Sequence, residues 1–361
     1  MDIAISGNSH TNNSGYFMFM FQEEYPITDF VDHTYTLGTG VTVLSELAVG
    51  NVDHILDREI LAIVKNSTNW VGIAKYRAQY GAKGGFNVSG NISYVISPGI
   101  DFINKLRSTN LLLVKPQFRV PENPVYHNRL FFGIAKKFAP GIPRATSYAT
   151  YCFDFSESNT VADLIWSHVD DSRTPVNQVA PTDIAPGKLI AGDFYPDNFG
   201  IEILTTASEE VIDIETGDRI QHLTNDYCPI NGGYYHRNRR PAVLTDTGLI
   251  NSQDVILFRE NQMAAYSTFE HPIQGIRSNF FADIKSLALG SAVNNGVRDL
   301  YALVGDTDVP GIGLYRIPIK PNYAEDRDEW TQFQGNERKT AQYLSSLPPM
   351  ITEAITIWQD V

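Results

Sequence analysis

The chain has 361 residues and a formal net charge of −13, from 41 acidic residues against 28 lysines and arginines. This charge argues against a protein that neutralises nucleic-acid phosphates, and no window of about 18 apolar residues offers a transmembrane helix. The composition therefore predicts an acidic protein that neither binds nucleic acid nor inserts into a membrane.

A unit of apolar strand, polar loop and apolar strand recurs along the chain. The loops of the seven copies lie near residues 8–15, 51–59, 101–110, 154–163, 193–202, 246–254 and 291–299. The copies begin about 47 residues apart, a period that is typical of solenoids and propellers. Their paired strands are expected at 3–7 with 16–21, 47–50 with 60–64, 94–96 with 111–114, 151–153 with 164–166, 189–192 with 201–204, 242–244 with 255–258, and 287–290 with 300–304.

Further short runs rich in β-branched and aromatic residues lie between the copies, at 70–76, 130–135, 210–214 and 313–317. With these runs each unit holds about four strands. Glycine and proline turn signals separate the runs, and almost nothing has the period of a long amphipathic helix. The sequence therefore predicts an all-β fold, a seven-bladed β-propeller with about four strands per blade, formed by residues 1–361 as one domain.

Two stretches carry a resemblance to a known family. Gly50-Asn51-Val52-Asp53 and Gly192-Asp193-Phe194 resemble the FG-GAP or VCBS repeat of integrin α-subunit propellers, propeller lectins, some polysaccharide lyases and surface adhesins. The resemblance implies the seven-bladed propeller, but it is unspecific for function. The chain departs from the family pattern in every copy; for example, Ile55 replaces the third acidic position in the second one.

Two of the loops carry candidate calcium ligands. Their side chains are short and bear oxygen, at a spacing that can direct them at one Ca²⁺ ion. The alternative needs no metal, because an Asx residue can hydrogen-bond its own turn and a closing acid can pin the next strand. The alternative is favoured for the loops that open at Asp101, Asp154, Asp246 and Ser291, and both interpretations stay open for the two candidate sets, Asn51, Asp53 and Glu59, and Asp193, Asp197 and Glu202.

An aromatic and basic loop at 231–241 interrupts the acidic chain. Arginine forks bind carboxylates, and tyrosine faces stack on sugar rings, so a glycan or an anionic ligand is expected there. Alternatively, the arginines pair with neighbouring acids, or the set abstracts a proton beside a uronate carboxylate. The candidate ligand-binding residues are Tyr234, Tyr235, His236, Arg237 and Arg239, with the related Tyr126 and Arg129.

These observations favour a non-catalytic binding or adhesion module, a lectin-like protein that recognises glycans or a protein partner through loops on one propeller face. We expect it to be extracellular or surface-associated, although no signal peptide is visible at the start. No nucleophile-elbow, zinc or phosphate-loop motif is present. The alternatives are a polysaccharide lyase and a structural or attachment part of a toxin or virus particle.

Residues 342–361 are expected to close the ring. The apolar segment 347–358 is predicted to pair as a strand with the blade that contains residues 16–21, because its β-branched residues lose rotamer freedom in a helix. A short helix that plugs the disc is the alternative, since Ile351, Ala354, Ile355 and Trp358 fit one helical face.

Overall fold

The computed structural model describes residues 3–9, 14–22, 30–53, 58–80, 86–97, 102–115, 128–138, 146–155, 160–169, 188–192, 201–205, 210–222, 242–245, 254–259, 262–267, 272–279, 284–290, 298–305, 312–319 and 342–343. These residues form 25 strands and no helix, which confirms the all-β prediction. Accordingly, no helix in this part of the chain could cross a membrane.

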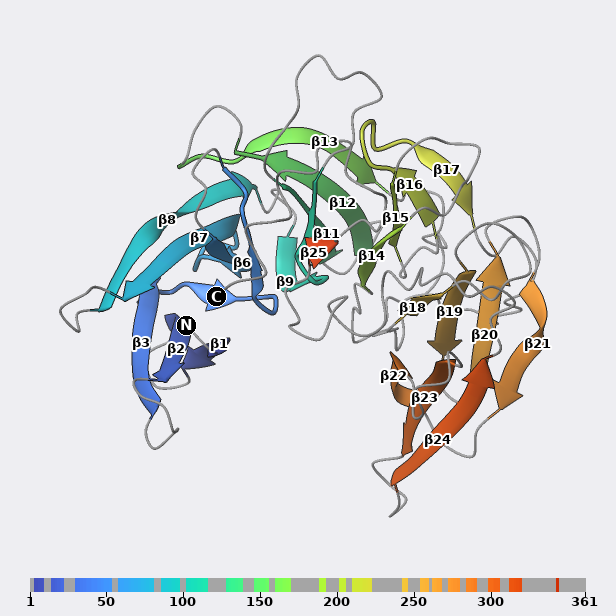
Figure 1. Ribbon diagram of the computed structural model, residues 1–361. Coiled ribbons are helices and arrows are strands. Elements are labelled where there is room, and N and C mark those ends of the chain that lie inside the picture. Colours follow the sequence, from blue (N-terminus) through green and yellow to red (C-terminus); the bar gives the residue numbers. More distant parts are fainter. Residues whose placement is uncertain are drawn as a thin grey trace, which may run out of the picture.

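The strands form six sheets that follow one another along the chain (Figure 1). All pairings are antiparallel except that between β10 and β25. Sheet 1 holds β1 (Ile3–Ser9), β2 (Ser14–Gln22) and β3 (Phe30–Thr39). Sheet 2 holds β4 (Thr42–Val43), β5 (Ala48–Gly50), β6 (Glu59–Lys65), β7 (Val71–Tyr80) and β8 (Phe86–Ile96). Sheet 3 holds β9 (Phe102–Ser108), β10 (Leu112–Val114), β11 (Arg129–Phe138), β12 (Thr146–Asp154), β13 (Asp163–Val169) and β25 (Gln342–Tyr343).

The last three sheets are smaller. Sheet 4 holds β14 (Leu189–Gly192), β15 (Glu202–Thr205), β16 (Glu210–Asp213) and β17 (Arg219–His222). Sheet 5 holds β18 (Ala242–Thr245), β19 (Asp254–Arg259), β20 (Gln262–Ser267) and β21 (Pro272–Asn279). Sheet 6 holds β22 (Ile284–Gly290), β23 (Arg298–Gly305) and β24 (Ile312–Ile319). The sequence predicted about four strands per unit; sheets 4 and 5 have four strands, and the other sheets have three, five or six.

Six of the seven predicted hairpins are present, and five of them, β1–β2, β5–β6, β14–β15, β18–β19 and β22–β23, each lie in a separate sheet. The prediction that 94–96 and 111–114 share a unit is wrong, because β8 pairs with β7 in sheet 2 and β10 pairs with β11 in sheet 3. The predicted fourth hairpin exists as β12–β13, but it belongs to sheet 3 as well. The predicted third and fourth units therefore contribute to one sheet, and seven blades stay a prediction.

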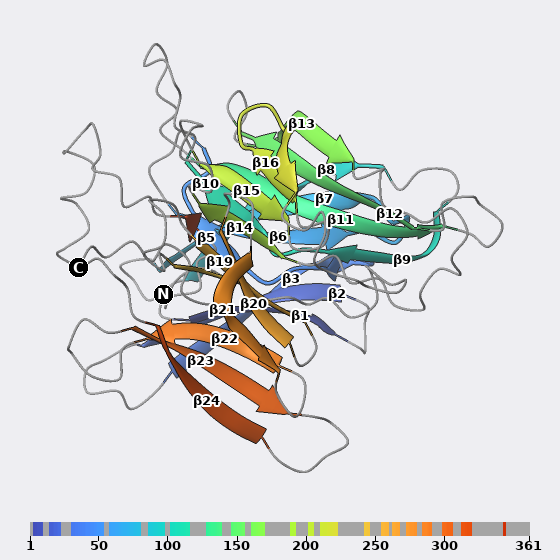
Figure 2. The ribbon, with the colours of Figure 1, turned by 90° about the vertical axis from the view of Figure 1, so that its right-hand side faces the viewer.

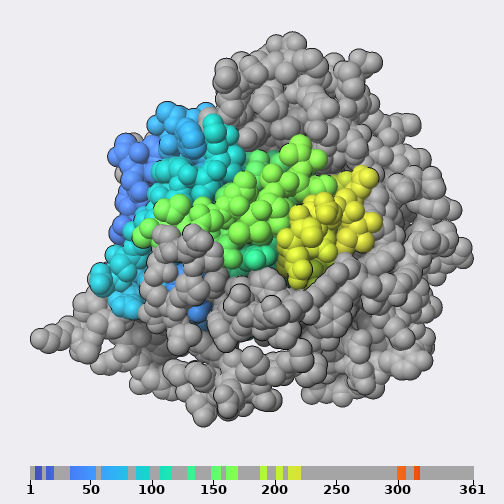
Figure 3. Space-filling model, turned by 90° about the horizontal axis from the view of Figure 1, so that it is seen from above, coloured from blue at the N-terminus to red at the C-terminus, as the bar shows by residue number. Residues whose placement is uncertain are grey.

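Sheets 1 to 4 stack on one another through shared hydrophobic cores. One core joins sheets 1 and 2, a second joins sheets 2 and 3, and a third joins sheets 3 and 4. The short strand β10 shows how this works, since Leu113 faces the second core while Leu112 and Val114 face the third. Its side chains alternate between two buried faces, which explains its unbroken apolar sequence. On the surface in Figure 3, β8 in cyan, β13 in green and sheet 4 in yellow lie side by side.

Two asparagine amides connect neighbouring sheets. The Asn8 Nδ2 donates to the Val43 carbonyl at 2.9 Å, and the Val43 N–H donates to Asn8 Oδ1 at 2.7 Å. The buried Asn110 makes the same pair of bonds to Leu189, at 3.1 Å and 2.8 Å. A side-chain amide offers one donor and one acceptor, as a strand residue does. Each amide therefore continues the hydrogen bonding of one sheet into the first strand of the next.

The described part of the C-terminal tail is β25. Gln342 and Tyr343 pair in parallel with Leu113 and Val114, so they lie at the edge of sheet 3 and not beside β2. Figure 1 and Figure 2 show β25 beside sheet 3 and away from β24, although β24 is the strand that precedes it in the sequence. The predicted strand at 347–358 lies outside the described residues.

Candidate functional site

The loop between β5 and β6 is the predicted site that the structure describes best. Its residues Asn51, Val52 and Asp53 follow β5, and Glu59 opens β6 opposite Gly50. The Asp53 N–H donates to Asn51 Oδ1 at 3.2 Å, which is an Asx turn. The Val52 N–H donates to Glu59 Oε2 at 3.0 Å. The first and last predicted ligands thus bind the loop's own backbone, as the metal-free interpretation describes.

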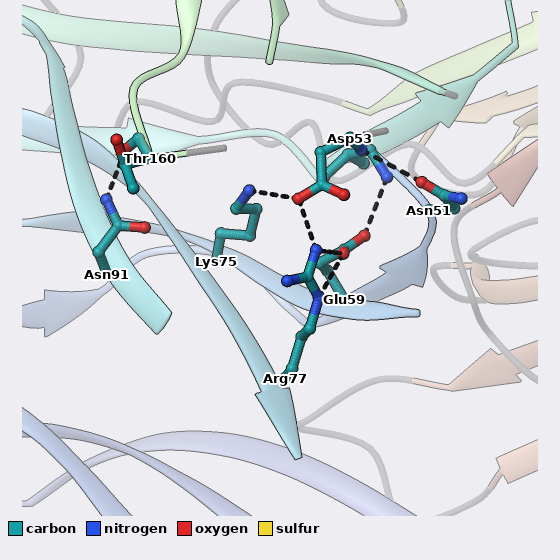
Figure 4. A network of polar contacts seen from close by, with 8 residues as sticks. Asn51, Asp53, Glu59, Lys75, Arg77, Asn91 and Thr160 are labelled. Carbon is teal, nitrogen blue, oxygen red and sulfur yellow. Dashed lines mark hydrogen bonds and ion pairs between the residues drawn. The ribbon is translucent and has the colours of Figure 1, made fainter. Parts of the chain in front are cut away.

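Two cations that the sequence reasoning did not include complete this site (Figure 4). Lys75 Nζ lies 2.7 Å from Asp53 Oδ2, and Arg77 Nη2 lies 2.6 Å from the same oxygen. Arg77 also donates to Glu59 through Nε, at 2.8 Å from Oε1, and through Nη2. The four side chains form one hydrogen-bonded network of two anions and two cations.

The strand pairing explains why these cations reach the loop. β7 runs antiparallel to β6 with Ile60 opposite Tyr76, so Arg77 lies beside Glu59 at the same end of the pair. Residues two apart on a strand share a face, so Lys75 points to the same side as Arg77. On that side Lys75 Nζ also lies 4.4 Å from the centroid of the Phe155 ring.

The network is largely removed from water. The side chains of Asp53 and Glu59 are 0% exposed, and that of Lys75 is 6% exposed. Burial raises the pKa of Glu59, and the bonds from Val52 and Arg77 oppose that rise without cancelling it. Burial alone would lower the pKa of Arg77, but the hydrogen bonds and negative charges of Glu59 and Asp53 together outweigh burial and raise the pKa. A buried network of this kind favours a single arrangement of its side chains. Any arrangement that breaks a pair leaves a buried charge without a counter-ion.

An acid that opens the second strand recurs in other sheets. Glu202 opens β15 opposite Gly192, and Asp299 on β23 lies opposite Gly290. Both acids are buried. Asp299 Oδ2 is bound by Arg316 Nε at 2.8 Å, which repeats the pairing of Glu59 with Arg77. An arginine 17 or 18 residues after the acid was the available sequence signal for both pairs.

Calcium binding stays a prediction for both candidate loops. Among the described residues, no group of three histidine, cysteine or acidic side chains is arranged to hold a metal ion. Asp193 and Asp197 lie outside the described residues. In the loop that is described, the two acidic side chains already have Lys75 and Arg77 as counter-ions.

The predicted ligand-binding residues Tyr126, Tyr234, Tyr235, His236, Arg237 and Arg239 also lie outside the described residues. The remaining one, Arg129, opens β11, and its Nε lies 3.3 Å from Asp154 Oδ2. Only 12% of its side chain is exposed. Arg129 is therefore engaged with an acid of the same sheet.

The comparisons with known proteins found no protein-family model that matches the chain, and no curated protein matched its sequence significantly either.

Proposed function

We propose that the chain is a β-propeller that acts as a non-catalytic binding module, recognising a glycan or a protein partner through loops at one end of its sheets. The observation that carries this proposal is the repeated register of the first hairpin. Gly50 with Glu59, Gly192 with Glu202, and Gly290 with Asp299 place the same loop at the same end of three sheets. Loops that a rigid scaffold gathers in this way are the usual carriers of binding residues.

The contacts between sheets support the propeller. Strands near the start of neighbouring sheets lie next to one another, as β1 with β4, β5 with β10, β10 with β14, and β18 with β22; β5 and β10 are the second strands of their sheets. In a propeller the first strand of each blade lies nearest the axis and meets its neighbours there. We propose that the sheets close into a ring, for which seven blades is the count that the sequence repeat predicts.

A glycan array with the purified full-length chain tests the function. We expect selective binding to a group of related glycans, with no change in uronate polymers incubated with the protein. If unsaturated-sugar absorbance rises in that incubation, the chain is a polysaccharide lyase and the proposal is wrong. If no glycan binds, the proposal survives only if a protein ligand is captured at the same loops.

The variant Tyr235→Ala/Arg237→Ala locates the binding residues. We expect it to lose at least about tenfold in affinity for the ligand, which corresponds to roughly 1.4 kcal/mol. Arg107→Ala is the control, because Arg107 is an exposed arginine on β9 and is not one of the predicted binding residues. Equal binding by both variants would place the ligand elsewhere on the molecule.

A further inference from the structure

We propose that Lys75 and Arg77 are the resident cations of the loop between β5 and β6, in the place where its oxygen ligands would otherwise hold a divalent ion. The loop is then a latent divalent-cation site that the chain fills with its own side chains. This inference concerns one loop and is independent of the proposed ligand binding.

The position of the ammonium group is the first argument. Lys75 Nζ lies 2.7 Å from Asp53 Oδ2 on one side and 4.4 Å from the centroid of the Phe155 ring on the other. A carboxylate and an aromatic face both attract a cation. Lys75 is thereby enclosed at a buried site whose nearest oxygen belongs to a predicted metal ligand.

The balance of charge is the second argument. Asp53 and Glu59 carry two negative charges when both are ionised, and their side chains are 0% exposed. Such a buried pair needs two positive charges close by. One divalent ion supplies them, and so do one ammonium and one guanidinium group. The structure contains the second solution, with all four contacts made to Asp53 Oδ2 or Glu59 Oε1.

The position of the cations in the chain is the third argument. Both lie on β7, whose residues 71–76 pair with β6 and so keep this end of β7 beside the loop. A metal ion would stabilise the loop only in proportion to its concentration relative to its dissociation constant. Tethered cations stabilise it at any ion concentration. The proposal therefore predicts that this loop keeps its structure in a chelator.

The full-length variant Lys75→Met/Arg77→Met tests this, because methionine retains much of the apolar stem and removes the charge. Lys65→Met/Arg107→Met is the matched control, since it removes the same two charges from positions away from the loop. Calcium is titrated into both variants and the wild type by calorimetry, and melting is followed with chelator or with millimolar calcium.

We expect the Lys75/Arg77 variant to bind one calcium ion more per chain than the wild type and the control. Its melting temperature should rise with calcium by roughly 5 °C more than theirs. Adding Asp53→Asn and Glu59→Gln to the variant should abolish the extra ion. Because the count is relative to the wild type, calcium bound at another loop does not affect the comparison.

Two results would overturn the proposal. One is a Lys75/Arg77 variant that binds no more calcium than the wild type. The other is a wild-type calcium site that disappears in Asp53→Asn. If the variant fails to fold in chelator, it is refolded with and without calcium. Recovery only with calcium supports the proposal, and failure under both conditions contradicts it.

Discussion

At the scale of single residues, the buried carboxyl group of Glu59 predicts how the stability of the fold depends on pH. Burial raises its pKa, so the folded chain keeps this proton at pH values where the unfolded chain has lost it. The stability from this group is therefore fully present below the unfolded pKa and is lost as the pH rises through the raised folded pKa. Above that value the loss levels off.

Glu59→Gln removes this titration and keeps an oxygen that can accept the bond from Val52. We expect the free energy of unfolding of the wild type, minus that of Glu59→Gln, to fall with increasing pH across the acidic range. Urea unfolding of both proteins at a series of pH values measures it. A difference that rises with pH would mean that Arg77, and not burial, dominates the pKa of Glu59.

A second prediction at this scale concerns the reactivity of the Cys152 thiol. Its thiol is free and buried on β12, and burial raises its pKa, so the reactive thiolate form is suppressed. In a Cys228→Ser variant, which leaves Cys152 as the one thiol of the chain, we expect no reaction with a thiol reagent at neutral pH until the protein is unfolded. Rapid labelling of the native variant would show that this part of sheet 3 opens readily.

At the scale of elements, the Asn110 amide connects sheet 3 to sheet 4. Asn110→Ala leaves the N–H and the carbonyl of Leu189 without their side-chain partner in a buried position. Buried backbone groups that lose their partner cost about 1–3 kcal/mol each. We expect a loss of roughly 2 kcal/mol or more in the free energy of unfolding, measured with urea. Asn87→Ala, at an exposed position on β8, is the control and should change it little.

The hairpins were predictable because their signals are local. Apolar runs on both sides of a short polar loop, as in 189–204, are sufficient to indicate two antiparallel strands. The sheet to which a hairpin belongs depends on distant pairing, which explains the error at β8 and β10. β10 has three residues, and its partner β11 begins after a long connection. Lys75 and Arg77 were missed for the same reason, since their contact with Asp53 requires the register of β7 on β6.

At the scale of the whole molecule, each stacked sheet depends on its neighbours. Sheets 2 and 3 have a shared core on each side, so neither could lose one neighbour without exposing buried side chains such as Leu61 or Phe131. Quasi-repeat proteins gain stability from such interfaces between adjacent units. No sequence period could have shown that the chain returns to sheet 3 at residues 342–343, because this contact joins positions that lie in no common repeat.

The pairing of residues 342–343 with sheet 3 leads to the final prediction, which compares two truncated chains. A chain that ends at Ala341 lacks β25 and leaves the edge of β10 unpaired, whereas a chain that ends at Ser346 retains the pairing of Gln342 and Tyr343 with Leu113 and Val114. We expect the shorter chain to be less stable to urea by about 1–3 kcal/mol, because backbone bonds at a buried strand are lost. It should also associate at high concentration, because an unpaired strand edge is a template for pairing with another chain. Equal stability and equal mass in solution for the two truncated chains would show that β25 does not hold the edge of sheet 3. A loss of stability already in the chain that ends at Ser346 would assign the structural role to residues 347–361, as the ring-closing prediction requires.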